Sequence, residues 1–143
     1  MKPLILLLIA FGISAIFSRI PFAGNVAMCA MFCFTALGHF KFHRGMVKMM
    51  PGFVPFKEAV VYVSGVAEIL LGAGLLFPVT REGSAIALLA FLAFVLPANI
   101  NAARKRVNYE TGGADGPGLR YLWFRVPAQV FYMAWLIYFG IRH

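Results

Sequence analysis

The chain has 143 residues and a formal net charge of +8, and its residues are 62% hydrophobic and only 13% charged. A soluble domain is roughly 45–50% apolar and about 25% charged. A chain of this length cannot hide so much apolar surface from water. The composition therefore excludes disordered, collagen-like and disulfide-rich proteins and indicates one integral membrane domain over residues 1–143. It argues against nucleic-acid binding, because the basic residues lie between long apolar runs.

Five apolar segments follow one another along the chain, at residues 4–17, 26–40, 59–78, 83–100 and 121–141. A spanning helix needs about 20 mainly apolar residues. The last three segments are long enough, and the second is long enough if its helix starts near Pro21, a good first-turn residue. The first segment is short. The prediction is an all-α, polytopic transmembrane helix bundle with five spans.

The first segment has an alternative interpretation as a secretory signal peptide, with Lys2 as its charged start. No clean cleavage site follows, because Phe17 and Arg19 stand where small residues are needed. We therefore expect this segment to remain as a short helix.

The basic residues predict the orientation in the membrane. With five spans, nine fall on one side and three on the other, a strong positive-inside pattern. This places the N-terminus in the cytoplasm and the C-terminus outside, in a plasma (bacterial inner) membrane. The nine are Lys2, Lys41, Arg44, Lys48, Lys57, Arg104, Lys105, Arg106 and Arg120, and the three are Arg19, Arg81 and Arg142.

Two connections are long. Residues 45–56 are apolar but contain Pro51, Gly52 and Pro55, so they cannot form a spanning helix. We expect them to lie at the interface or to fold back into the bundle. Residues 107–119 contain four glycines and a proline and predict a flexible cytoplasmic loop.

Polar side chains inside the apolar segments are the candidate functional residues, because such groups face the interior of a bundle and are often functional. At 1.5 Å per residue, four helices carry them to similar depths in the same half of the membrane. The expected intramembrane polar pocket consists of His39, Glu68, Asn99, Arg125 and Gln129.

Glu68 and Arg125 are the two deepest opposite charges, which predicts an ion pair between them. Such a pair could serve packing or function equally well. For the other three candidate residues, a structural role is favoured over a functional one. His39 would be a hydrogen-bonded core residue, Asn99 would bond backbone freed by Pro97, and Gln129 would bridge two helices.

The sequence gives little support for thiol chemistry or for metal binding. Cys29 and Cys33 are four residues apart, which is neither a C-x-x-C nor a zinc pattern, so they are expected to be apolar fillers. His39 and His43 could share one helix face, but two ligands do not make a metal site. No catalytic residue follows from the sequence, and no metal is expected.

Several short motifs, in order along roughly 100 residues, resemble the DoxX-like family of small membrane proteins. The resemblance implies a four-helix core at residues 21–141 with residues 4–17 as an N-terminal addition, and it places the family's polar positions on the five candidate residues. The motifs are Gly38-His39-Phe40, the Pro51/Pro55 loop, Gly65-x-x-Glu68-Ile69-Leu70-Leu71-Gly72, Leu76-Phe77-Pro78-x-x-Arg81, Pro97-Ala98-Asn99-Ile100 and Leu122-Trp123-x-Arg125-x-Pro127-x-Gln129.

The resemblance implies a role without a defined reaction. Members of that family include a subunit associated with thiosulfate:quinone oxidoreductase and one linked with superoxide dismutase and a sulfurtransferase. The expected function is therefore a non-catalytic membrane subunit or scaffold serving a redox complex. Its expected partners are the lipid bilayer and the proteins of a membrane redox complex. Whether the chain also forms a homo-oligomer stays open.

Two alternatives stand beside that expectation. The first is a quinone- or small-molecule-binding membrane oxidoreductase, in which Glu68 and His39 move protons while Arg125 and Gln129 bind an oxygen-rich head group. A quinone or a lipid would then be the ligand, and whether the protein is an enzyme stays open. The second is a carrier, against which the small size and the lack of an inverted repeat weigh.

Overall fold

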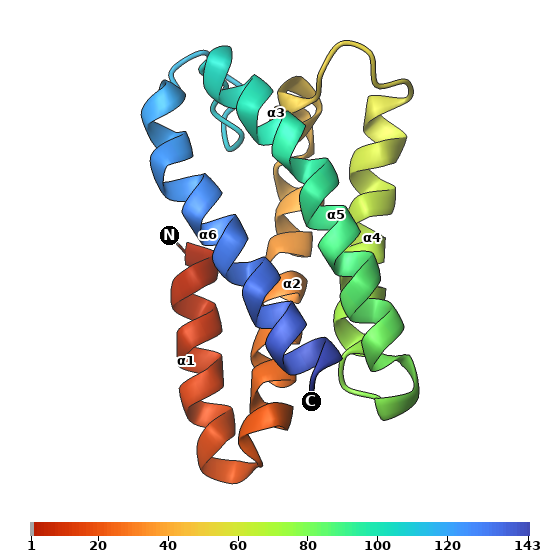
Figure 1. Ribbon diagram of the computed structural model, residues 1–143. Coiled ribbons are helices and arrows are strands. Elements are labelled where there is room, and N and C mark those ends of the chain that lie inside the picture. Colours follow the sequence, from red (N-terminus) through yellow and green to blue (C-terminus); the bar gives the residue numbers. More distant parts are fainter. Residues whose placement is uncertain (1) are drawn as a thin grey trace.

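The computed structural model describes residues 2–143, and every regular element in that range is helical (Figure 1). Five long helices coincide with the five apolar segments. They are α1 (Lys2–Phe17), α2 (Ile20–Lys41), α4 (Lys57–Gly74), α5 (Pro78–Arg104) and a last helix built from η1 (Gly118–Tyr121), α6 (Leu122–Trp135) and the π-helical turn η2 (Leu136–Ile141). A short helix, α3 (His43–Met49), lies between α2 and α4. The prediction of an all-helical protein is thus confirmed.

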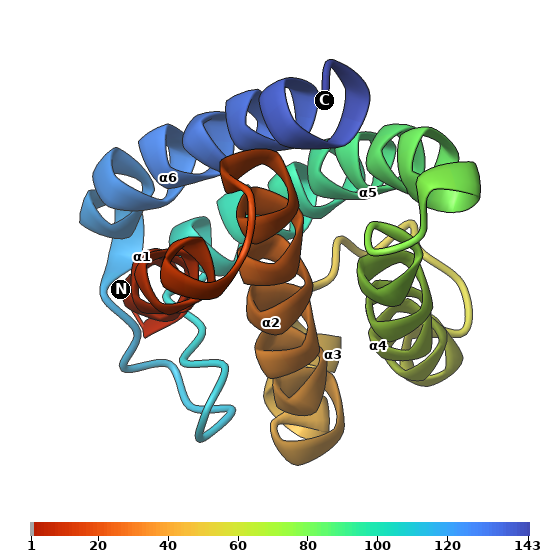
Figure 2. The same cartoon turned by 90° about the horizontal axis from the view of Figure 1, so that it is seen from below.

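The helices α2, α4, α5 and α6 alternate in direction, and α1 runs antiparallel beside α2 (Figures 1 and 2). α4 packs on α2 and α5, and α6 packs on α5. The end of the chain returns to the start of α2, where Asn25 Nδ2 donates to Phe139 O (2.9 Å) and Trp135 Nε1 donates to Gly24 O (3.0 Å). The bundle is closed by these last contacts.

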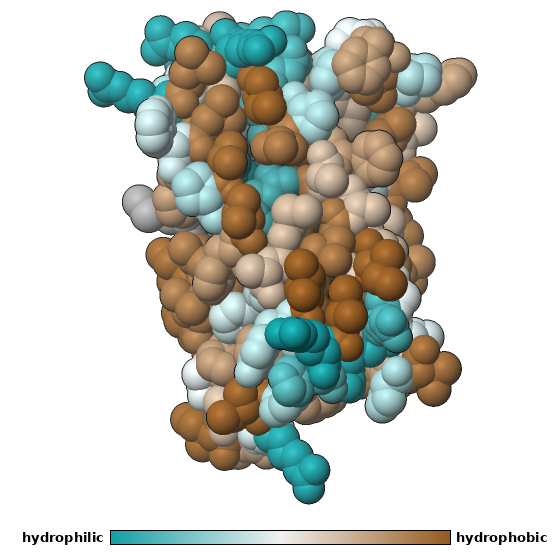
Figure 3. All heavy atoms as spheres, in the orientation of Figure 1, coloured by the Kyte–Doolittle hydropathy of each residue, from teal (hydrophilic) through white to brown (hydrophobic). Residues whose placement is uncertain are grey.

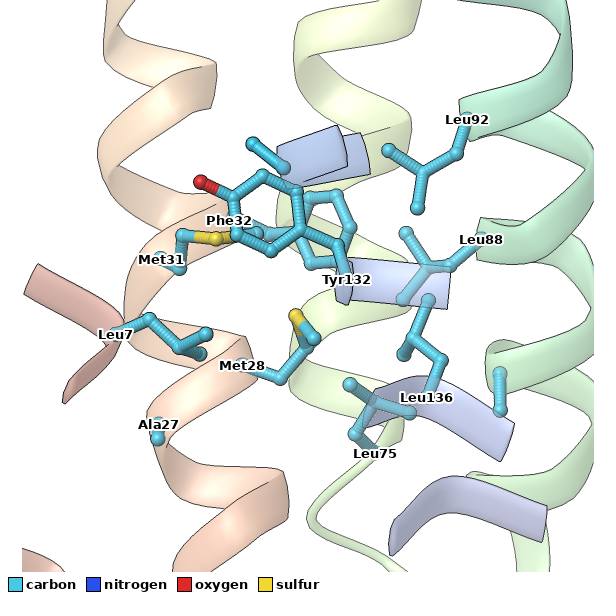
Figure 4. Packing of buried hydrophobic residues seen from close by; sticks show 12 residues of the cluster. Leu7, Ala27, Met28, Met31, Phe32, Leu75, Leu88, Leu92, Tyr132 and Leu136 are labelled. Atoms are coloured by element: carbon cyan, nitrogen blue, oxygen red, sulfur yellow. The ribbon is translucent and has the colours of Figure 1, made fainter. Parts of the chain in front are cut away.

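The core lies between α2, α5 and the last helix, with α1 covering one side. Phe32 and Met28 of α2 meet Leu88 of α5 and Leu136 of η2, and Leu7 of α1 is also fully buried (Figure 4). Prolines mark where helices begin, because their fixed φ suits a first turn. Pro21 is the second residue of α2, and Pro78 is the first residue of α5.

Three helical stretches are long and apolar enough to cross a membrane: Ile20–Lys41, Pro78–Arg104 and Gly118–Ile141. α1 is apolar but shorter. α4 has 18 residues but carries Lys57, Glu58 and Glu68. Large apolar side chains remain exposed on the bundle, as expected where lipid covers them, and brown side chains cover much of the face in Figure 3. A membrane protein is therefore supported, and three of the five predicted spans qualify by length and composition.

Most of the basic residues gather at one end of the bundle, where α2 and α5 end and α4 and η1 begin (Figure 1). We call this the basic end, and hydrophilic side chains cover much of it in Figure 3. Residues 45–56 are helical as far as Met49, whose carbonyl accepts a hydrogen bond from Asn101 Nδ2 (2.7 Å). The segment forms no spanning helix, as predicted, and its helical part, α3, packs back on α4 and α5.

The loop at residues 107–117 folds against α3. Lys48 Nζ donates to Gly112 O (2.7 Å), and the Tyr109 carbonyl approaches Gly45 so closely that a Cβ at residue 45 would collide with it. The loop therefore has a defined position at the basic end.

Candidate functional site

His39 and Glu68 form the ionisable pair at the centre of the site. His39 lies near the end of α2, and Glu68 lies in the middle of α4. His39 Nε2 is 3.5 Å from Glu68 Oε2, and Glu68 is only 4% exposed. Gly65 lets the helices approach here, because a Cβ on Gly65 would lie 2.9 Å from His39 Cβ. Small residues at such contacts are typical of packed membrane helices.

Two hydroxyl groups complete the cluster, and each comes from the preceding turn of its own helix. Thr35 Oγ1 lies 3.1 Å from Glu68 Oε2 and can donate to it. Ser64 Oγ lies 3.0 Å from His39 Nδ1 and donates to Val61 O (2.8 Å). These residues are absent from the sequence-based candidates. Their spacing of four residues from His39 and from Glu68 is the signal that could have identified them.

The arrangement can hold one proton between the two helices. His39 Nδ1 lies 3.1 Å from Val61 O and can donate to it. The proton shared by Nε2 and Oε2 can then sit on either atom, which gives an imidazolium with a carboxylate or a neutral pair. His39 Nδ1, His39 Nε2 and Glu68 Oε2 each have a partner from the protein itself, so the cluster joins α2 to α4.

Gln129 and Asn99 lie elsewhere, on α6 and α5. Gln129 Nε2 donates to Leu92 O, so this side chain bridges α6 and α5 as predicted. Asn99 is 1% exposed, and its Nδ2 has no hydrogen-bond partner among residues 2–143. The expectation that this amide donates to backbone freed by Pro97 was therefore wrong. Gln129 Oε1 is likewise buried and without a partner in the described chain.

The predicted ion pair between Glu68 and Arg125 was also wrong. Within residues 2–143 the ion pairs are His39–Glu68 and Lys2–Glu110. The reason is lateral packing: α4, which carries Glu68, packs on α2, whereas α6, which carries Arg125, packs on α5 (Figure 2).

The positive charge of Arg125 is instead close enough to Tyr109, in the loop at the basic end, to affect the pKa of that tyrosine. Burial raises the pKa of Tyr109 above its usual value. The neighbouring Glu110 and Tyr121 raise this pKa further, and the Arg125 guanidinium lowers it. Of the five candidate residues, hydrogen bonds and ion pairs therefore join only His39 and Glu68 directly.

Cys29 and Cys33 are free thiols, and both are half-buried. Across residues 2–143, no three His, Cys, Asp or Glu side chains come together in a way that could hold a metal ion. Within the described chain, His39 and Glu68 can share a proton, and the amides of Asn99 and Gln129 can form hydrogen bonds.

The fold and site define a helical membrane-protein class with a His–Glu pair between α2 and α4, in which Glu68 is buried and His39 is half-buried. A family model described as a domain of unknown function (DUF8561) matches residues 28–139, well over half of the 143-residue chain. The chain belongs to this family. The match begins within α2 and leaves α1 outside. No curated protein and no solved structure matches the chain.

Proposed function

We propose that this protein is a DoxX-like integral membrane protein with five spans, in a bacterial inner membrane. Its core would be α2, α4, α5 and α6 within residues 21–141, with α1 as an N-terminal addition. The alternating helix directions support this topology, and so does a family match that leaves α1 outside. The charge at the basic end supports an N-terminus in the cytoplasm and a C-terminus outside.

Within that topology, the protein acts as a non-catalytic membrane subunit or scaffold for a redox complex. The observation that carries this proposal is the internal pairing of its most buried ionisable group. Glu68 is engaged by His39 and Thr35, and His39 is engaged by Ser64 and Val61, all from α2 and α4. A pair held in this way by groups of both helices fixes the register of the two helices.

Native mass analysis of gently extracted protein tests this proposal. A scaffold is expected to retain a stoichiometric protein partner. That partner should remain on a folded His39→Gln variant, since the pair would serve packing only. A wild-type protein that carries no protein partner would contradict the proposal.

The second candidate is a quinone- or small-molecule-binding membrane oxidoreductase. It is favoured by Asn99 Nδ2 and Gln129 Oε1, a donor and an acceptor that are buried without partners in the described chain. Unsatisfied buried polar atoms are costly. A quinone carbonyl could accept a hydrogen bond from Asn99 Nδ2, and a hydroxyl of the reduced quinol could donate one to Gln129 Oε1. Solvent extraction of the purified protein should then release about one quinone per chain, and Asn99→Leu should reduce that amount. Only trace quinone in the wild type would reject this candidate.

A further inference from the structure

A hollow of about 320 Å³ opens at the basic end, among the end of α2, α3, the start of α4 and the loop at residues 107–117. It is separate from the polar contacts of His39 and Glu68. The side chains that matter for its chemistry are Lys41, His43, Arg44, Tyr62 and Glu110.

The charge of the hollow is positive. Lys41 and Arg44 are exposed cations on its wall. The one carboxylate of the lining, Glu110, lies 3.6 Å from Lys2 Nζ, so a cation outside the lining already balances it. An anion is therefore the ligand that this wall attracts.

His43 adds a directional polar group. Its ring stacks on Tyr62, with the centroids 4.2 Å apart and the planes at 15°, which holds the imidazole in place. His43 Nε2 is buried and has no hydrogen-bond partner within residues 2–143. In the tautomer that carries a proton on Nε2, this atom can donate to a phosphate oxygen, as Lys41 and Arg44 can.

Tyr62 also lines a second hollow, of about 340 Å³, whose other residues are all apolar: Val63, Val66, Ala67 and Leu70. These residues follow one another down the outer face of α4, away from the basic end. From Tyr62 to Leu70 the helix rises about 12 Å. The basic hollow and the apolar groove thus share Tyr62, and the groove runs from this residue along the exposed, apolar face of α4.

We propose that the two hollows together bind one anionic phospholipid. Its phosphate lies among Lys41, His43 and Arg44, and one acyl chain lies along the α4 groove beyond Tyr62. A free phosphate would use the first hollow only. An amphiphile uses both, and basic residues at a membrane surface attract anionic lipid. This site does not depend on the proposed scaffold role.

The test is lipid binding by the purified full-length chain in dodecyl maltoside, followed by native mass spectrometry. The probes are phosphatidylglycerol, phosphatidylcholine with the same acyl chains, and inorganic phosphate. We expect one phosphatidylglycerol per chain, bound more tightly than phosphatidylcholine. Lys41→Gln with Arg44→Gln should weaken phosphatidylglycerol about 25-fold, since each basic residue near the surface contributes about fivefold.

The matched control is Arg104→Gln with Lys105→Gln, which removes two exposed cations from the same end but outside the hollow. It should bind as the wild type does. Val66→Trp, which fills the groove and keeps the basic wall, should weaken phosphatidylglycerol. If the Lys41/Arg44 variant does not fold, Arg44→Gln alone should weaken binding about fivefold.

Three results would overturn the proposal. The first is equal phosphatidylglycerol binding by the wild type and the Lys41/Arg44 variant. The second is an equal loss in the Arg104/Lys105 control, which would mean diffuse attraction to the whole basic end. The third is competition by inorganic phosphate together with unchanged binding by Val66→Trp, which would make a free anion the ligand.

Discussion

Breaking the contact between His39 and Glu68 tests the central assignment of the site. The perturbation is a double-mutant cycle made of Glu68→Gln, His39→Gln and the two together. Glutamine keeps nearly the volume of Glu68 and can still accept the hydrogen bond from Thr35 Oγ1, so the change is confined to the pairing with His39.

The structure sets the expected magnitude. The Nε2–Oε2 distance of 3.5 Å is long for a hydrogen bond, but Glu68 is only 4% exposed. Each single variant leaves a buried polar group poorly satisfied, at a cost of about 1–3 kcal/mol in unfolding free energy. Polar contacts between membrane helices average about 0.6 kcal/mol and reach about 1.7 kcal/mol. The double variant should therefore lose about 1 kcal/mol less than the sum of the single losses.

Equilibrium unfolding in mixed micelles, with rising dodecyl sulfate and detection by circular dichroism, measures these free energies. A second cycle with Glu68→Gln and Arg125→Gln is the control. It should be additive within about 0.5 kcal/mol, because the two residues share no contact. Additive His39 and Glu68 losses, or coupling between Glu68 and Arg125, would refute the assignment.

Three further predictions use other parts of the chain. Cys29→Ala with Cys33→Ala should change the melting temperature little, because both thiols are free, half-buried and small; a large fall would show that they matter for packing. Gly45→Ala should lower the melting temperature and speed proteolysis of the loop at residues 107–117, because its Cβ would collide with the Tyr109 carbonyl, whereas Gly52→Ala has open space and should do neither; equal effects would argue against the close approach. A C-terminal alkaline phosphatase fusion should be active and a cytoplasmic reporter there dark, and the reverse would reject the proposed orientation.

The helices themselves could be predicted from the sequence. A helix forms through bonds between residues four apart, and an apolar run is visible locally, so all five apolar segments became helices near their expected ends. The bridging role of Gln129 was also predicted correctly. The clustering of basic residues at one end followed from the same alternation of segments and connections.

Which polar side chains meet between two helices could not be predicted from the sequence and was decided by the tertiary structure. Depth along a helix follows from sequence position, but the lateral neighbour of each helix and its rotation do not. Glu68 was therefore placed at the right depth and assigned the wrong partner, because α4 packs on α2 and not on α6. In the described part of the chain, Asn99 and Gln129 form no hydrogen bond with His39 or Glu68, because the packing of α5 and α6 places them against other groups. Packing between helices, which sums many weak contacts far apart in the chain, decided which polar groups meet.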